Sequence, residues 1–133
     1  MVYEDGQQLR DFVTVWDVAR ANLIAIDDPR SDFKALNVGG GRAITVLDYA
    51  QVVSRALACP VTPELPGRFR VGDTRHICSD ISTLADLGWR PKHTLEEAAS
   101  AYAEWAQAQP GFGDYTDSGL KTMTDQGVVR DAR

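Results

Sequence analysis

Four stretches of the chain combine apolar residues with the signals of a helix start. Each follows a residue whose side-chain oxygen can accept a hydrogen bond from the free backbone N–H groups of a first helical turn. The predicted caps are Asp17, Thr45, Asp80 and Thr94, and the first two helices should end near residues 27 and 57. Side chains expected to face inward include Val46, Val53, Leu84, Ala99 and Tyr102.

Short runs rich in β-branched and aromatic residues predict strands between these helices. Residues 2–4 and 8–15 flank Asp5-Gly6, a pair suited to a tight turn, so the chain is expected to open with a β-hairpin. Further strands are predicted at 35–38 and at 69–71, with a turn following at Gly72. The resulting order, ββαβαβαα, is a mixed α/β arrangement.

The pattern weakens toward the C-terminus. Four of the eleven glycines lie after Pro110, and no helical or strand periodicity continues there. We therefore expect one folded domain over residues 1–109 and a disordered tail over 110–133. A length of 133 residues suits a single hydrophobic core.

Composition narrows the classes of function. The net charge of −5 argues against nucleic acid as the main partner, because phosphate binding needs a basic surface. Two cysteines are too few for a secreted disulfide scaffold or a four-cysteine zinc site. Since we find neither a signal peptide nor a membrane-length apolar run, we expect a soluble, cytoplasmic protein without a membrane partner.

Two motifs suggest ligands only weakly. The run Gly39-Gly40-Gly41 resembles a phosphate cradle, but it satisfies neither the G-x-G-x-x-G spacing nor the P-loop pattern, so we favour a structural turn over phosphate contact. His76, Cys78 and Asp80 alternate and could share one side of a strand, yet a structural zinc site needs four ligands. We therefore expect a hydrogen-bonding role for His76 and no metal.

Arginines on the predicted strands are the most informative charges. They are Arg10, which precedes Asp11, and the arginines of the group Arg68, Arg70, Asp73 and Arg75. Paired guanidinium groups can clamp a diphosphate, and a nearby carboxylate can accept hydrogen bonds from sugar hydroxyls. Composition alone leaves ion pairs at strand edges as the alternative.

Five ordered segments carry a family resemblance that covers residues 2 to about 108. The sequence YEDGQQLRDFVTVWDVARA at 3–21 resembles a segment of NAD-dependent nucleoside-diphosphate-sugar epimerases and dehydratases, in the extended short-chain dehydrogenase/reductase family. The similarity continues through LNVGGG, RVGDTRH, SDIS and LGWRP, which begin at positions 36, 70, 79 and 87. The form RVGDTRH looks most like bacterial sugar-nucleotide 4-epimerases, including the dTDP-rhamnose type.

The resemblance implies an α/β fold equivalent to the C-terminal substrate-binding portion of that family, without the N-terminal Rossmann half. That family binds NAD through a glycine-rich turn and uses a Tyr-x-x-x-Lys pair as its catalytic base. Here Lys34, Lys92 and Lys121 are never preceded by a tyrosine four places earlier. We therefore expect no catalytic residues and no cofactor bound by this chain alone, with NAD remaining the cofactor of the parent family.

The resemblance also implies a substrate-binding site. Arg10 and Arg70 fall at arginines that reach the diphosphate, and Asp73 falls at the carboxylate facing the nucleotide ribose. The expected partners are a nucleoside-diphosphate sugar and a separate N-terminal Rossmann half. The expected function is the nucleotide-sugar-binding portion of an epimerase, with a stand-alone binding module or a non-functional fragment as alternatives.

Overall fold

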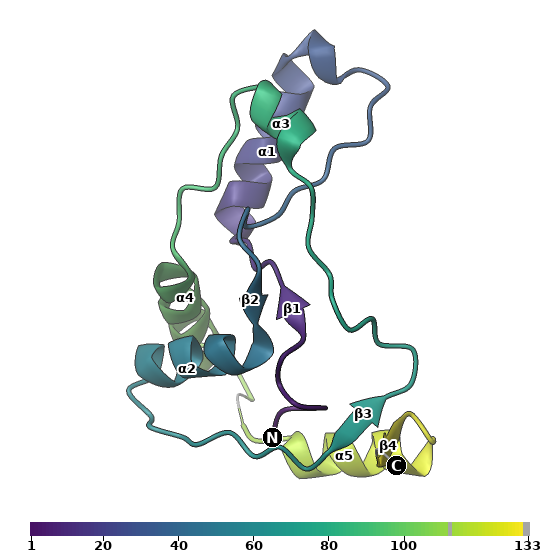
Figure 1. The fold of residues 1–133 in the computed structure, drawn as a ribbon. Coiled ribbons are helices and arrows are strands. Elements are labelled where there is room, and N and C mark those ends of the chain that lie inside the picture. Colours follow the sequence, from purple (N-terminus) through teal and green to yellow (C-terminus); the bar gives the residue numbers. More distant parts are fainter. Residues whose placement is uncertain (112, 132–133) are drawn as a thin grey trace.

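The computed structural model describes residues 1–111 and 113–131, and it has the mixed α/β character expected from the sequence (Figure 1). The chain is elongated, with α1 and α3 at one end and α5 beside β3 and β4 at the other (Figure 1). In chain order the elements are β1 (Leu9–Arg10), α1 (Val15–Asp27), the 3₁₀ turn η1 (Pro29–Ser31), β2 (Ile44–Thr45), α2 (Val46–Ala56), β3 (Arg68–Arg70), α3 (Ser82–Asp86), α4 (Leu95–Gln107), α5 (Thr116–Asp125) and β4 (Val129–Asp131).

Two separate antiparallel pairs make up the strands of the described residues. β1 pairs with β2, placing Leu9 opposite Thr45, and β3 pairs with β4. The predicted opening hairpin is therefore wrong, although the turn at Gly6 is present, with φ of +74°. The backbone N–H groups of Val2 and Glu4 donate instead to the carbonyls of Glu64 and Arg68. Residues 2–4 therefore lie beside residues 64–68 and not beside residues 8–15.

Capping side chains set the starts of three helices. The Thr45 hydroxyl accepts from the Asp48 N–H at 3.0 Å, and Thr94 forms the predicted capping box with Glu97. The prediction for α1 is wrong, because Thr14 rather than Asp17 is its N-cap. The Thr14 hydroxyl accepts from the Asp17 N–H, which leaves the Asp17 carboxylate free to bind elsewhere.

A small core joins α1 to α3. Ala21, Leu84 and Trp89 are fully buried together, and Leu36 and Val38 pack against them. Residues 35–38 belong to no strand, contrary to the prediction, because no described segment pairs with their backbone. Their apolar side chains still follow the predicted inward orientation.

A second packing contact joins α2 to α4. Val52 and Ala99 are the buried residues of these two helices. Tyr102 is 68% exposed, so its predicted inward position is wrong. The short helix α3 does bury Leu84 as expected, but the predicted cap is wrong, because its N-cap is Ile81 rather than Asp80. The Asp80 carboxylate accepts from the Ser82 N–H, one residue further into the helix.

The structure differs from the expected disordered tail. α5 lies within residues 110–133, and β4 pairs with β3 in a register that places Arg70 opposite Val129. Residues 112, 132 and 133 of that tail lie outside the described residues. Val129 is buried, which the low hydrophobicity of the surrounding sequence did not indicate.

The outer face of α1 carries large apolar side chains. Trp16, Leu23 and Ile26 are 52%, 60% and 78% exposed, whereas Asp17 and Ala21 of the same helix are buried. An ordinary surface helix presents a polar face outward, so these exposed apolar side chains depart from that pattern. No helix in the described part of the chain is both long and apolar enough to cross a membrane.

Candidate functional site

The loop after β3 holds two of the predicted site residues as an ion pair. The Asp73 N–H donates to the Arg70 carbonyl at 3.2 Å, which closes the turn predicted at Gly72, where φ is +89°. The Arg70 guanidinium then donates to one Asp73 carboxylate oxygen through Nε at 2.9 Å and Nη2 at 2.7 Å. Arg70 and Asp73 therefore lie together, but the Arg70 guanidinium, which was expected to bind a ligand, is hydrogen-bonded to the Asp73 carboxylate.

The same loop meets the third predicted residue. From β1, the Arg10 guanidinium donates to the carbonyls of Thr74 and Arg75 at 3.0 and 2.8 Å, and to its neighbour Leu9 at 2.7 Å. All three bonds use Nη1 and Nη2, so two of the five guanidinium N–H groups find no acceptor among the described residues. The structure thus gathers Arg10, Arg70 and Asp73 around residues 70–75.

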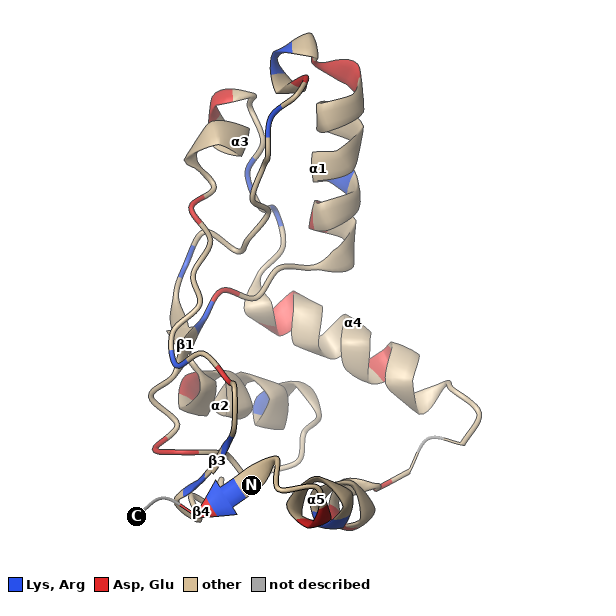
Figure 2. Cartoon of the chain, turned by 90° about the vertical axis from the view of Figure 1, so that its right-hand side faces the viewer, with Lys and Arg blue, Asp and Glu red and all other residues tan. Residues whose placement is uncertain are grey.

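Charge compensation distinguishes Arg10 from its neighbours. Arg68 pairs with Asp131 at 3.1 Å, and Arg75 pairs with carboxylates from the opening turn. Figure 2 shows acidic and basic positions close together around β1 and β3. Within the described ranges, Arg10 bonds only to backbone carbonyls. Its positive charge is consequently the least compensated of this group, which makes it a candidate anion contact.

The glycine run is a close-packed turn and does not fit a pyrophosphate. A Cβ on Gly39 would lie 2.1 Å from an Asp11 carboxylate oxygen, and one on Gly40 would lie 2.1 Å from the Phe12 carbonyl. The space at these glycines is therefore filled by the chain itself, including a negative charge that would repel phosphate. This supports the structural interpretation, and it places Asp11 against this turn rather than in the predicted hairpin.

Histidine 76 takes part in backbone hydrogen bonding. Its Nδ1 accepts from the Leu9 N–H at 3.2 Å. Cys78 is exposed, and no three His, Cys, Asp or Glu side chains come together as a metal site in the described ranges 1–111 and 113–131.

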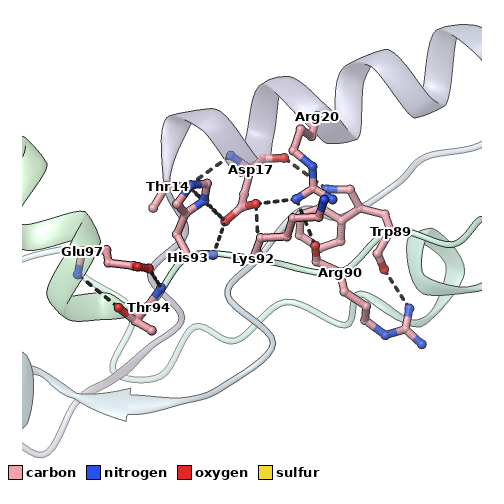
Figure 3. A network of polar contacts seen from close by, with 9 residues as sticks. All are labelled: Thr14, Asp17, Arg20, Trp89, Arg90, Lys92, His93, Thr94 and Glu97. Atoms are coloured by element: carbon pink, nitrogen blue, oxygen red, sulfur yellow. Dashed lines mark hydrogen bonds and ion pairs between the residues drawn. The ribbon is translucent and has the colours of Figure 1, made fainter.

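The most buried polar cluster surrounds Asp17 (Figure 3). Its carboxylate, 1% exposed, accepts from the backbone N–H groups of Lys92 and His93 at 3.1 and 3.2 Å. It also accepts from the His93 ring at 2.9 Å and from Arg20 at 2.6 Å. The Trp89 indole N–H donates to the Asp17 carbonyl at 3.1 Å, so a single residue ties α1 to the segment before α4.

Opposing effects act on the acidity of this carboxyl. Burial raises the pKa of Asp17, but hydrogen bonds from the His93 ring and from the Lys92 and His93 N–H groups outweigh it and hold the pKa well below its usual range. Asp17 is therefore a charged structural residue. The sequence around Asp17 does not indicate this role, because its partners other than Thr14 and Arg20 lie 72 to 76 positions away.

The described residues form several cavities, among them a polar pocket and an apolar groove. The polar pocket of about 390 Å³ is lined partly by Arg42, Arg55 and Glu96, and the apolar groove of about 430 Å³ by Trp16, Tyr102 and Trp105. Neither is lined by the three predicted site residues. Residues 70–75 are themselves exposed.

Comparison with known proteins relates the chain to a family. Residues 1–39 match the model of the NAD dependent epimerase/dehydratase family. A dTDP-L-rhamnose 4-epimerase of Burkholderia thailandensis is 36% identical over 105 residues, which are 78% of this chain and 29% of the relative.

Solved structures give the same relationship. A UDP-glucose 4-epimerase of Thermotoga maritima with UDP-glucose is 33% identical with a TM-score of 0.71, over 80% of this chain and 34% of that one. A UDP-glucose 4-epimerase of Bifidobacterium longum in complex with NAD+ and UDP is 26% identical with a TM-score of 0.67, over 82% and 33%. The chain spans about a third of the length of these proteins. In sequence and in fold, the chain is therefore related to about a third of the length of the NAD-dependent nucleoside-diphosphate-sugar epimerases and dehydratases.

Proposed function

We propose that this chain is the nucleotide-sugar-binding portion of an epimerase, and that Arg10, Arg70 and Asp73 bind the nucleoside diphosphate. The observation that carries the proposal is the convergence of all three residues on one loop, where Arg10 has no carboxylate partner and two N–H donors without an acceptor among the described residues. Guanidinium groups bind phosphate oxygens with two parallel hydrogen bonds and stay charged at any ordinary pH.

The Arg70–Asp73 ion pair suggests how a ligand enters. A diphosphate that approaches Arg70 competes with the Asp73 carboxylate for the same guanidinium, and both side chains are partly exposed. Released from Arg70, Asp73 can accept hydrogen bonds from ribose hydroxyls. The expected order is phosphate contact first and sugar contact second, with binding weakened by the cost of breaking the pair.

Catalysis would require residues that the printed sequence does not contain. The 133 residues hold no Tyr-x-x-x-Lys pair, and the glycines at 39–41 do not suit NAD. The chain's own contribution is therefore to bind and orient the diphosphate. Hydride removal and return at the sugar carbon would depend on NAD held by a Rossmann half.

The outward apolar face of α1 supports such a partner. Burying Trp16, Leu23 and Ile26 against another polypeptide would remove apolar surface that water now contacts. Residues 35–38 would at the same time gain the strand partner that the described residues do not supply. We therefore propose a Rossmann half, on the same or a separate polypeptide, as the partner of this face.

Calorimetric titration with UDP at low salt tests the proposed site. Each charge-assisted hydrogen bond contributes roughly 1.5 to 3 kcal/mol, so Arg70→Ala should weaken binding about tenfold to a hundredfold. Asp73→Ala should reduce the preference for UDP over pyrophosphate while leaving pyrophosphate bound. Arg30→Ala, which removes a paired exposed arginine near the end of α1, is the matched control. Equal affinity in the wild type and in Arg70→Ala would overturn the proposal.

A further inference from the structure

The loop that carries the proposed site runs alongside β1. Beyond the two bonds from Arg10, the Leu9 N–H donates to His76 Nδ1 at 3.2 Å, and the Ile77 N–H donates to the Leu9 carbonyl at 3.0 Å. β1 is therefore held by β2 on one edge and by residues 74–77 on the other. Movement of this segment away from β1 would separate Arg10 from the rest of the site.

Arg75 ties the same segment to the opening turn of the chain. One guanidinium nitrogen donates to the Glu4 carboxylate, and the other donates to Asp5 at 2.7 Å. Hydrogen bonding from Arg75 also holds the pKa of Asp5 below its usual value. A planar guanidinium that bonds two neighbouring carboxylates limits both the distance and the angle between the segments it joins.

The opening turn also contacts the other end of the loop. The Arg70 guanidinium carbon lies 5.3 Å from the centre of the Tyr3 ring, and the Glu4 N–H donates to the Arg68 carbonyl at 2.6 Å. Residues 3–5 thus touch the loop both before its turn, at Arg68 and Arg70, and after it, at Arg75.

From these contacts we propose that Arg75, Glu4 and Asp5 are positioning residues, which hold Arg10 and Arg70 at the separation that a diphosphate needs. The inference rests on the proposed function, since it assigns a purpose to side chains that do not themselves contact the ligand. A site whose geometry exists before binding loses less conformational entropy when the ligand arrives.

Electrostatics and positioning predict opposite effects when the two carboxylates are removed. The Glu4→Ala/Asp5→Ala variant loses two negative charges near an anion site, so attraction by charge alone predicts tighter UDP binding. Positioning predicts weaker binding, because Arg75 then has no anchor. Arg75→Lys separates the two effects again: it keeps the charge, but a single ammonium cannot reproduce the fixed geometry of the guanidinium.

Calorimetry with UDP at low salt is the decisive measurement. We expect Glu4→Ala/Asp5→Ala to weaken binding about threefold to tenfold, and Arg75→Lys to weaken it by a smaller factor. Asp28→Ala is the matched control, since it removes a half-buried carboxylate that pairs with an arginine at the far end of the molecule. Unchanged or tighter binding by the Glu4→Ala/Asp5→Ala variant would overturn the positioning role.

Amide hydrogen exchange separates failure of this inference from failure of the proposed function. The Leu9 and Ile77 amides should exchange faster in the Glu4→Ala/Asp5→Ala variant than in the wild type and in Asp28→Ala. We call the contacts of Arg75 with Glu4 and Asp5 the Arg75 clamp. A wild-type protein that binds no UDP would refute the proposed function, while the exchange rates would still show whether the Arg75 clamp holds the loop against β1. Unchanged exchange at both amides would refute the positioning role of the Arg75 clamp, whether or not UDP binds.

Discussion

The Asp17 carboxylate accepts a hydrogen bond from the His93 ring at 2.9 Å, across 76 positions of sequence. Asp17 lies in the first turn of α1, and His93 lies immediately before the N-cap of α4. This contact, with those from the Lys92 and His93 backbone, joins the part of the chain that contains the α1–α3 core to the α2–α4 pair.

Replacing this carboxylate should cost much of the stability of the fold. We expect Asp17→Asn to lower the free energy of unfolding by about 3 kcal/mol, because removing one member of a buried ionic network leaves its partners unsatisfied. Urea denaturation followed by tryptophan fluorescence measures the change. Asp32→Asn, at an exposed position, should change it little. A loss below about 0.5 kcal/mol for Asp17→Asn would contradict the structural role.

Acid should weaken the protein through the same residue. The pKa of Asp17 is depressed in the folded state, so its contribution to stability is complete above the unfolded value of about 3.9 and is lost as pH falls below it toward the folded value. Unfolding free energies measured between pH 7 and pH 2 should therefore decline mainly below about pH 4. Asp17→Asn should flatten that decline, and an equally steep decline in the variant would assign it to other carboxyls.

Two glycine-to-alanine substitutions should change the stability of the protein in opposite directions. Gly40→Ala would place a Cβ 2.1 Å from the Phe12 carbonyl, so we expect a loss of about 1 to 3 kcal/mol. Gly119 lies within α5 with open space around it, and Gly119→Ala should stabilise the protein by up to about 1 kcal/mol. Thermal unfolding of both variants checks the pair. A neutral Gly40→Ala would show that the backbone there can shift at little cost.

The isolated chain should associate through the outer face of α1. Leu23 and Ile26 are exposed on this apolar helix face, and water contact with them is unfavourable. Light scattering over a range of concentrations should show association in the wild type and much less in Leu23→Glu/Ile26→Glu. Gln107→Glu, on the exposed side of α4, adds charge away from that face and serves as control. A concentration-independent wild-type monomer would contradict this expectation.

The 133-residue chain should convert no nucleotide sugar. Without a Tyr-x-x-x-Lys pair it has no identified base for the sugar hydroxyl, so incubation with NAD and UDP-glucose should yield no epimer. Product chromatography measures conversion, and cofactor fluorescence measures NAD binding. Epimerisation that is abolished by Arg70→Ala would require a base that the sequence does not reveal.

Features governed by local interactions were predictable from the sequence. The caps at Thr45 and Thr94 and the turn at Gly72 depend on residues within three positions of each other, and all are present. The strand predicted at 69–71 is present as β3, displaced by one residue. The family resemblance was also readable, because its motifs are short and occur in order. The residues of the proposed site came from those motifs rather than from charge or periodicity.

Contacts between distant segments were decided only by the tertiary structure. β1 pairs with β2 rather than with residues 2–4, and β4 pairs with β3 across 59 to 63 positions. The buried role of Asp17 and the clamp from Arg75 to Glu4 likewise join residues more than 70 positions apart. Strand pairing and buried ion pairs depend on which backbone and charged groups meet in space, and neither hydrophobic spacing nor local propensity specifies that meeting.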